Sequence, residues 1–281
     1  MCQYTFFITK IYRDQNPIPG WGLQNSGVSM QFDFEHGHLR EFSGFSVLIN
    51  GDLLPTDRDE GYYQGFFDYR KIASDPDTKI VRGRGETYIY RHDGHRLVLR
   101  EYLRGGLFGK FVRRSYLAFF RKSYRAFQEF ELLRLLRLYN LHVPMPVLAR
   151  VKYKFPFVYN EIVLQEIERC RNLDEILLSR ALSPREIANI KEQIAALFKF
   201  RIVHTDLNIR NVLVDDREEA YIVDFDKCYV KDEFRQEDRL RMVDRMMRSF
   251  YKQKELYSEA HKKYFYNEEL VNEIVSLADD L

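Results

Sequence analysis

Apolar residues recur at helical spacing in the third quarter of the chain, after a short polar start signal. Ser183-Pro-Arg-Glu186 has the form of a capping box, with proline at the first helical position. This pattern predicts an amphipathic helix from residue 184 to about residue 200. Its apolar face is formed by Ile187, Ile190, Ile194, Leu197 and Phe198.

Two short apolar runs separated by a polar turn follow this helix. The runs are Asn211-Val-Leu-Val and Ala220-Tyr-Ile-Val, and the turn is Asp215-Asp-Arg-Glu-Glu. Short apolar runs on either side of a charged turn predict a β-hairpin. Because Asn211 enters the first strand and Asp224 leaves the second, we expect both residues at the same open end of the hairpin.

The upstream half of the chain predicts strands around one helix. Residues 80–102 are expected to form strand, turn and strand, with Gly83 and Gly85 near the start. Ser123 to about Tyr139 is predicted to be a helix that ends before Val143-Pro-Met-Pro, because proline disfavours helix in the preceding residue. Its apolar face is formed by Phe127, Phe130, Leu133, Leu136 and Leu138, with Arg134 and Arg137 expected outside it.

Candidate catalytic residues lie between the helix predicted to end near residue 200 and the hairpin that follows it. The segment is His204-Thr-Asp-Leu-Asn-Ile-Arg-Asn211, and Asp224-Phe-Asp226 follows the hairpin. An aspartate five residues before an asparagine, with another aspartate beyond a hairpin, is how kinases place a base and two metal ligands. A buried Asp-Asn pair that only satisfies loop amides is the alternative. The spacing of the second aspartate favours the catalytic interpretation.

The predicted strands of the upstream half, and the helix predicted from Ser123 to about Tyr139, supply candidate nucleotide-binding residues. A Gly-x-Gly turn lets backbone amides approach phosphate oxygens, although alone it marks an ordinary tight turn more often. Arg100 ends a strand where a kinase carries the lysine that grips the α- and β-phosphates, and Glu129 is its natural partner. A solvated surface charge is the alternative for Glu129. Adenine is expected at backbone groups near Glu166 and Glu168, where a strand enters a linker.

Net charge is only +2, but basic residues are concentrated in one region. Residues 96–154 hold fourteen Lys and Arg against three Glu, which suggests an anionic partner. Residues 104–125 combine basic and aromatic side chains, so we expect them at an anionic membrane surface or a lipid head group, with ordinary lobe structure as the alternative. The basic members are Arg104, Lys110, Arg113, Arg114, Arg121, Lys122 and Arg125.

Cysteine usage and hydropathy bear on the compartment. Cys2, Cys170 and Cys228 are far apart and lack metal-ligand spacing, which fits a reduced compartment. No apolar run approaches the length of a membrane span, and the N-terminus lacks the pattern of a signal peptide. We therefore expect a cytoplasmic protein, with no nucleic-acid partner and no feature that indicates an obligate protein partner.

Together these segments resemble the lipopolysaccharide kinase group, and most closely the 3-deoxy-D-manno-octulosonic acid (Kdo) kinase family. The resemblance covers about residues 80–255. Its specific parts are Arg104-Gly-Gly-Leu and Asp224-Phe-Asp in place of Asp-Phe-Gly, which separate the family from ordinary protein kinases and aminoglycoside phosphotransferases. Lys227 stands where the family usually has arginine. The matching segments are residues 97–107, 127–133, 143–146, 204–211 and 223–227.

The resemblance implies an α+β, bilobal protein-kinase-like fold, with a mainly β N-lobe that carries one long helix and a mainly α C-lobe. We assign the N-lobe to residues 76–168 and the C-lobe to residues 169–281. Residues 1–75 are expected to form an extension of strands and loops packed on the N-lobe. The implied activity is ATP-dependent transfer of the γ-phosphoryl group to a Kdo hydroxyl on a lipid A precursor, at the cytoplasmic face of the inner membrane.

The implied cofactors are ATP and Mg²⁺. Gly83 and Gly85 would cover the phosphates, and Arg100, held by Glu129, would orient them. In the catalytic loop, Asp206 would accept the proton of the acceptor hydroxyl. Five further residues complete this loop and its metal site. Asn208 is expected to orient the acceptor or the γ-phosphate, His204 to brace the loop, and Asn211 and Asp224 to bind magnesium, with Asp226 as a further metal or acceptor ligand.

Three other classes of protein remain open. A small-molecule phosphotransferase of the aminoglycoside type would share the site without needing a basic aromatic surface. An atypical protein kinase would need a longer segment than the roughly ten residues between Asp226 and the helical pattern near Gln236. A pseudokinase that binds membranes is disfavoured because Asp206, Asn211 and Asp224 are all present.

Overall fold

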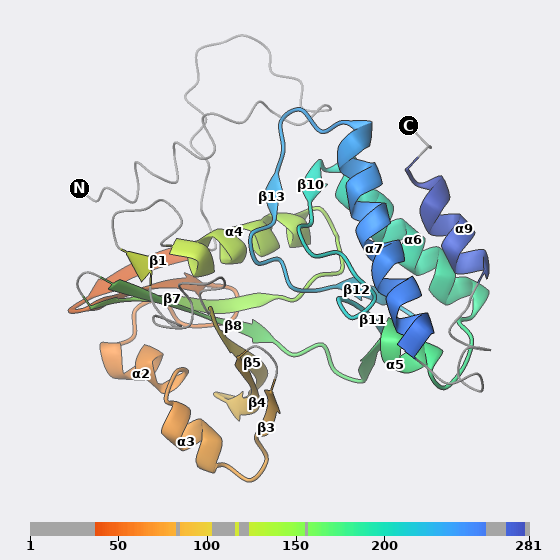
Figure 1. Ribbon diagram of the computed structural model, residues 1–281. Coiled ribbons are helices and arrows are strands. Elements are labelled where there is room, and N and C mark those ends of the chain that lie inside the picture. The colour runs from red at the N-terminus through yellow and green to blue at the C-terminus, as the bar shows by residue number, and fades with distance from the viewer. Residues whose placement is uncertain are drawn as a thin grey trace.

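The chain folds into two lobes, one built on a large sheet and one mainly helical (Figure 1). The computed structural model describes residues 37–82, 85–102, 116–117, 124–154, 157–256 and 268–278. This is the α+β, bilobal arrangement expected from the sequence. Within the described residues, no helix is both long and apolar enough to cross a membrane.

The N-lobe is an antiparallel sheet in the order β1-β2-β7-β8-β5-β4-β3, and β6 pairs with β8. Helix α4 lies on one face of this sheet, and the short helices α2 and α3 lie on the other (Figure 1). The strands are β1 (Gly37–Phe42), β2 (Phe45–Asn50), β3 (Lys79–Arg82), β4 (Glu86–His92), β5 (His95–Glu101), β6 (Tyr116–Leu117), β7 (Pro146–Lys154) and β8 (Phe157–Gln165). The helices are α2 (Glu60–Gly65), α3 (Tyr69–Ser74) and α4 (Arg125–Leu138).

Alternation along β5 decides which side chains lie on the face of the sheet that carries α4. Leu97 and Leu99 are buried in the apolar layer under α2 and α3. Val98 packs against the opposite layer, which contains α4. Because successive side chains of a strand point to opposite faces, Arg100 lies on the same face as Val98. The sheet therefore directs the Arg100 side chain toward α4 and the C-lobe.

The first strands of the chain belong to the sheet itself. We expected residues 1–75 to pack on the N-lobe as an extension, but β1 and β2 continue its hydrogen-bonded ladder. In the β2–β7 register, Phe45 faces Lys152 and Ile49 faces Leu148. The division of the chain at residue 75 remains a prediction, and residues 1–36 lie outside the described part.

Helix α4 is slightly shorter than the sequence pattern predicted. Two placements were wrong. Leu138 was expected on the apolar face, but it is the last helical residue and is 69% exposed. Arg134 was expected outside, but it pairs with Glu131, and its guanidinium lies against the backbone at Gly37 of β1. The cause is tertiary, because β1 covers a side of the helix that local periodicity leaves polar.

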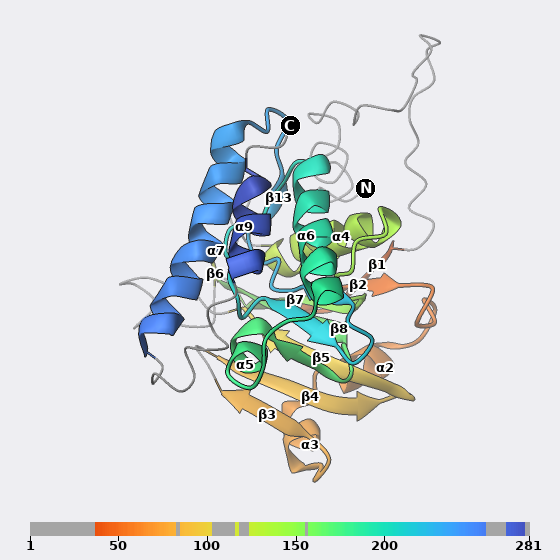
Figure 2. The ribbon, with the colours of Figure 1, turned by 90° about the vertical axis from the view of Figure 1, so that its right-hand side faces the viewer.

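The C-lobe packs helices against two small sheets (Figure 2). Strands β12, β11 and β9 form one sheet, and β10 pairs with β13 in the other. In Figure 2 the helices α6, α7 and α9 stand side by side. The helices are α5 (Leu173–Leu177), α6 (Pro184–Lys199), α7 (Gln236–Leu256) and α9 (Glu268–Ser276). The strands are β9 (Cys170–Asn172), β10 (Ile202–Val203), β11 (Val212–Asp215), β12 (Ala220–Ile222) and β13 (Tyr229–Val230).

Two local predictions in the C-lobe are confirmed. The capping box of α6 is present: the Glu186 N–H donates to Ser183 Oγ at 3.1 Å, and the Ser183 N–H donates to the Glu186 carboxylate at 2.7 Å. The hairpin of β11 and β12 pairs Val212 with Ile222 and Val214 with Ala220. Both features depend on neighbours in the sequence, which is why the pattern alone specified them.

A buried ion pair in the N-lobe sheet generates the first testable expectation. Glu161 is fully buried, and its carboxylate accepts two hydrogen bonds from Arg150, at 2.7 and 2.9 Å. Replacing Glu161 by Ala strands the buried guanidinium, so we expect a loss of about 3–5 kcal/mol in the free energy of unfolding. Asp216→Ala is the matched control, because the Asp216 side chain is 52% exposed in its pair with Arg169. Urea unfolding that shows equal midpoints for the two variants would contradict this expectation.

Candidate active site

Two loops from the C-lobe lie side by side at the boundary with the N-lobe. The first, residues 204–211, connects β10 to β11, and the second, residues 223–228, connects β12 to β13. Pairing of β10 with β13 closes the two loops at one end. At the other end, the Val223 N–H donates to the Asn211 carbonyl at 2.9 Å. The predicted juxtaposition of Asn211 and Asp224 at the open end of the hairpin is thus present.

His204 ties the first loop to the second from within the core. Its Nδ1 accepts from the Asp206 N–H at 3.3 Å, so the ring proton sits on Nε2, which donates to the Val223 carbonyl at 3.1 Å. The ring meets Phe225 edge-on, with 4.8 Å between centroids. Burial lowers the pKa of His204 to about 4. The imidazole is therefore neutral at physiological pH and braces the loop, as expected from the sequence.

The two asparagines of the first loop hold the backbone beneath Asp206. The Nδ2 groups of Asn208 and Asn211 each donate to the Asp206 carbonyl at 2.9 Å. The Asp206 side chain is exposed, and no described residue donates a hydrogen bond to its carboxylate. This arrangement holds the backbone of the loop and leaves the Asp206 carboxylate exposed. Asn208 supports the loop, and its proposed contact with acceptor or γ-phosphate stays a prediction.

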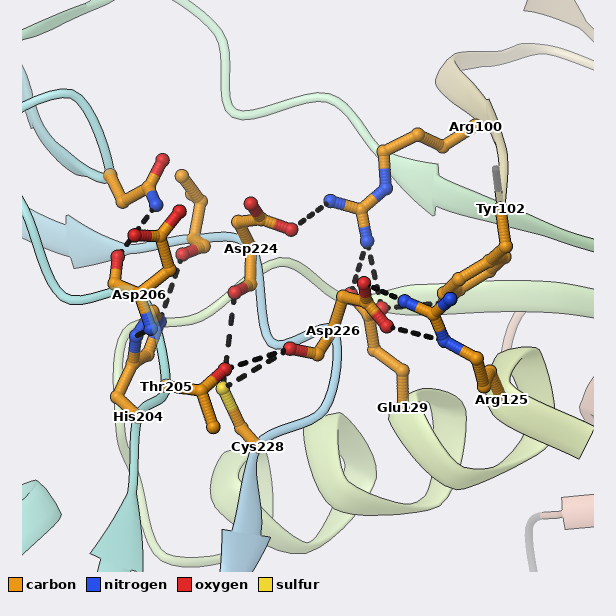
Figure 3. A network of polar contacts seen from close by, with 12 residues as sticks. Arg100, Tyr102, Arg125, Glu129, His204, Thr205, Asp206, Asp224, Asp226 and Cys228 are labelled. Atoms are coloured by element: carbon orange, nitrogen blue, oxygen red, sulfur yellow. Dashed lines mark hydrogen bonds and ion pairs between the residues drawn. The ribbon is translucent and has the colours of Figure 1, made fainter. Parts of the chain in front are cut away.

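Arg100 bridges the two lobes through two carboxylates (Figure 3). Its Nη2 donates to both oxygens of Glu129, at 2.6 and 2.8 Å, so the predicted ion pair is present. Its Nη1 donates to Asp224 Oδ1 at 2.7 Å. The Tyr102 hydroxyl donates to Glu129 Oε2 at 2.5 Å. Residues from β5, α4 and the second loop are thereby joined in one network.

Burial sets the electrostatics of this network. Glu129 is 3% exposed, and burial raises the pKa of its carboxyl, while Arg100 and the Tyr102 hydroxyl oppose that rise. For Arg100, burial alone would lower the pKa, but the carboxylates of Glu129 and Asp224 outweigh it and leave that pKa well above its ordinary value. Arg100 is therefore a permanent positive charge, suited to phosphate oxygens.

The second carboxylate of the Asp-Phe-Asp segment has a different partner. Asp226 Oδ1 accepts from Arg125 Nε at 2.9 Å, and its Oδ2 accepts from Arg125 Nη2. Arg125 was expected in the basic, membrane-facing stretch, and that placement was wrong: its side chain is 10% exposed and points into the site. The rest of residues 104–125 lies outside the described residues, apart from the backbone of residues 116–117 and Tyr124. A metal role for Asp226 stays a prediction.

The nucleotide-binding predictions are placed only in part. Gly83 lies outside the described residues, and Gly85 directly precedes β4. The Glu166 N–H, expected near adenine, instead donates to the Arg96 carbonyl at 3.0 Å. The side chains of Glu166 and Glu168 both face Arg96, the second at 3.8 Å. Contact between adenine and the backbone near Glu166 and Glu168 stays a prediction.

The oxygen atoms that Asn211 and Asp224 offer as ligands suit a magnesium ion. The amide of Asn211 is oriented by its Nδ2 bond to the Asp206 carbonyl, and this leaves Oδ1 as an acceptor without a partner among the described residues. Asp224 adds hard carboxylate oxygens on a side chain that is partly exposed. The described residues hold no group of three or more His, Cys, Asp or Glu side chains arranged for a metal. Two protein ligands plus phosphate oxygens and water are the usual magnesium environment in nucleotide sites.

Asp224 also has an unusual backbone conformation. Its φ is +66°, in the left-handed region that non-glycine residues seldom occupy. Sparsely populated backbone conformations cost free energy and persist where the surroundings enforce them, often at functional sites. Here the bonds to Arg100 and the pairing of Val223 with Asn211 hold the residue in place. No sequence pattern indicated this conformation.

The fold and site together define an enzyme of the protein-kinase-like class. The comparison with known proteins specifies the group: a model of the lipopolysaccharide kinase (Kdo/WaaP) family matches residues 78–268. The chain belongs to this family. A protein named 3-deoxy-D-manno-octulosonic acid kinase from Vibrio cholerae serotype O1 is 39% identical over 174 residues, which cover 61% of this chain and 72% of that protein. Relatives of the same name from Vibrio parahaemolyticus and Haemophilus influenzae (strain 86-028NP) are 38% and 35% identical, over 63% and 53% of this chain and 73% and 65% of their own.

The neutral His204 generates an expectation about stability and pH. The folded protein keeps the ring neutral down to about pH 4, whereas the unfolded chain protonates it below about 6.5. The contribution of the neutral His204 ring to the free energy of unfolding is therefore fully present above pH 6.5. It is lost as the pH falls toward 4, by about 3 kcal/mol in all. We expect His204→Gln, whose amide can still donate to the Val223 carbonyl, to lose stability on acidification less steeply than the parent. Parallel curves of unfolding free energy against pH would argue against a buried neutral histidine.

Proposed function

We propose that this protein is an ATP-dependent kinase that transfers the γ-phosphoryl group to a hydroxyl of a Kdo sugar in the lipopolysaccharide inner core. The observation that carries the proposal is the assembly of Asp206, Asn211 and Asp224 on two adjoining loops, opposite the Arg100–Glu129 pair. The names of the curated relatives support the choice of acceptor. Kdo attached to a lipid A precursor is the form of acceptor that we propose.

The residues would divide the reaction between positioning and proton transfer. Arg100 grips the α- and β-phosphates while Glu129 fixes its side chain, and Gly83 and Gly85 let the backbone approach the phosphates. Asp206 accepts the proton of the acceptor hydroxyl and aligns that oxygen with the γ-phosphorus. Preorganised positive charge beside the transferring group is the larger part of catalysis in such sites.

Magnesium would be held by two of the site residues. Asn211 Oδ1 and the Asp224 carboxylate are the proposed ligands. When bound, the ion would neutralise charge on the phosphate oxygens. Asp226 is a weaker candidate, because Arg125 occupies both of its carboxylate oxygens.

A protein substrate fits this site less well than a sugar. Helix α7 begins at Gln236, close to where the sequence pattern placed it. Only residues 227–235 separate it from Asp226, which leaves little chain for the peptide-binding platform of a protein kinase. An aminoglycoside-type phosphotransferase shares the site, so the acceptor itself must be tested.

The direct test is incubation of the protein with ATP, magnesium and Kdo-lipid A, followed by mass spectrometry of the lipid. We expect the mass of one phosphate on the Kdo sugar. Aminoglycosides and a generic protein substrate serve as parallel acceptors under the same conditions. Efficient phosphorylation of either of these, with none of Kdo-lipid A, would move the protein to another class of kinase.

Asp206→Asn should lower turnover by about 10²–10⁴-fold, the usual range for loss of a general base. Mg-ATP affinity should change little, because the described bonds of Asp206 to the loop use its backbone atoms. Asp232→Asn, at an exposed position outside the site, is the matched control. Turnover like that of the parent in folded Asp206→Asn protein would remove Asp206 from the proposed mechanism.

Asp224→Asn should abolish magnesium-dependent binding of ATP, because a neutral amide is a poor ligand for a hard cation. Calorimetric titration with ATP in the presence of magnesium, and again in the presence of EDTA, measures the effect. The parent and the variant should differ only when magnesium is present. Tight Mg-ATP binding by the variant would place the metal site elsewhere.

Association with the cytoplasmic face of the inner membrane is part of the proposal. It follows from a lipid-linked acceptor and from the basic and aromatic composition of residues 104–125, most of which lie outside the described residues. Co-sedimentation with anionic vesicles across a salt series tests it. Binding that is independent of both vesicle charge and salt would argue against an electrostatic attachment.

A further inference from the structure

Helix α4 sends two charged side chains to the Asp-Phe-Asp segment, one directly and one through a partner (Figure 3). Arg125 and Glu129 are four residues apart and therefore lie on the same face of the helix. Glu129 holds Arg100, which binds Asp224. Arg125 binds both carboxylate oxygens of Asp226. Each aspartate of the segment is thus bonded to a different arginine of the N-lobe.

The first turn of α4 is fixed in place by the sheet as well. The guanidinium of Arg125 lies over the Tyr102 ring, 5.3 Å from its centroid. The Ala126 N–H, one of the unpaired donors at the start of the helix, donates to the fully buried Asn160 side chain at 3.1 Å. The Asn160 carbonyl in turn accepts from the Tyr102 N–H at 3.0 Å. Strand β8 and the residue that directly follows β5 therefore fix the helix start from which Arg125 reaches the C-lobe.

We propose that Arg125 is a positioning residue whose pairing with Asp226 locks α4 onto the Asp-Phe-Asp segment, and that Asp226 is its counter-ion rather than a metal or acceptor ligand. The lock sets the position of Glu129 and, through it, of Arg100. Arg125 thereby acts on ATP binding without touching the nucleotide. The inference rests on the proposed function for its reaction, but the lock can also be measured by ATP binding alone.

Charge balance supports this role. Three carboxylates, those of Glu129, Asp224 and Asp226, meet only two guanidinium groups, those of Arg100 and Arg125. Without Arg125, Asp226 would be left uncompensated close to two further negative charges. The paired geometry also explains the residue types, because a planar guanidinium can donate from two separate nitrogens, one to each oxygen of a carboxylate. Glycine at position 226, as in Asp-Phe-Gly, would offer Arg125 no partner.

A double-variant cycle tests the lock. Arg125→Gln, Asp226→Asn and the double variant are compared with the parent for Mg-ATP affinity, for kcat and for the KM of each substrate. We expect each single variant to raise the KM for ATP about tenfold or more, since each strands one charge of the pair. In the double variant two neutral amides face each other. The factor by which the double variant raises the KM for ATP should be at least about threefold smaller than the product of the factors for the two single variants.

Two further variants separate positioning from general damage. Arg137→Gln lies on the same helix outside the network and should leave the KM for ATP unchanged. Arg125→Lys keeps the charge but lacks the two-pronged geometry, so it should recover only part of the loss. Thermal unfolding of every variant identifies any that fail to fold. The KM for ATP should rise while the KM for the acceptor stays near that of the parent, whereas a loss of folded protein would lower the apparent kcat and leave both KM values unchanged.

Opposite outcomes overturn the inference. Asp226 is a metal ligand if two results are found together. The first is that Asp226→Asn alone raises the KM for ATP as much as the double variant does. The second is that Asp226→Asn weakens the apparent affinity for magnesium while Arg125→Gln does not. If the single losses simply multiply, the two residues act independently. Failure of the proposed function is distinct: the parent would leave Kdo-lipid A unphosphorylated, while the cycle measured by Mg-ATP binding would still report on the pair.

Discussion

The ionised, buried carboxylate of Glu129 is the constraint on which the site depends. Removing a carboxylate from water costs several kcal/mol, on the order of what a whole domain retains as net stability. That cost is offset only where a permanent cation and further donors meet both oxygens. Arg100 and Tyr102 do so: Arg100 lies on β5, Tyr102 directly follows that strand, and both side chains reach Glu129. The positions of β5 and α4, and with them the geometry of the site, are therefore set by the need to compensate the buried charge of Glu129.

The catalytic loop differs from this network, because its buried polar group, the His204 imidazole, is neutral. His204 makes one hydrogen bond with each ring nitrogen and carries no charge in the interior. A neutral, fully bonded imidazole joins two loops at little desolvation cost, while Asp206 of the same loop keeps an exposed carboxylate. The site thus separates a charged half, at the N-lobe boundary, from a neutral supporting half inside the C-lobe.

Sequence patterns predicted the parts of the fold that are determined locally. The start of α6, the hairpin of β11 and β12 and the order of the catalytic segments follow from residues within a few positions of one another. The Arg100–Glu129 pair was predicted from element order. Sequence patterns could not predict what depends on distant contacts: the place of β1 and β2 in the sheet, the burial of Arg134, or the turn of Arg125 toward Asp226. The four-residue spacing of Arg125 and Glu129 was a signal for the last of these, since it places both on one helical face.

The membership of β2 in the sheet bears on the solubility of shorter forms of this chain. Strand β2 pairs with residues 148–152 along one edge of β7, and its alternate residues Phe45, Val47 and Ile49 belong to the apolar layer beneath α2 and α3. A chain that began after residue 75 would leave β7 with a row of unpaired amides and carbonyls next to an open apolar surface. Such an edge is a template for pairing with a second copy. The region that carries none of the proposed catalytic groups would then decide whether the enzyme stays dispersed or aggregates.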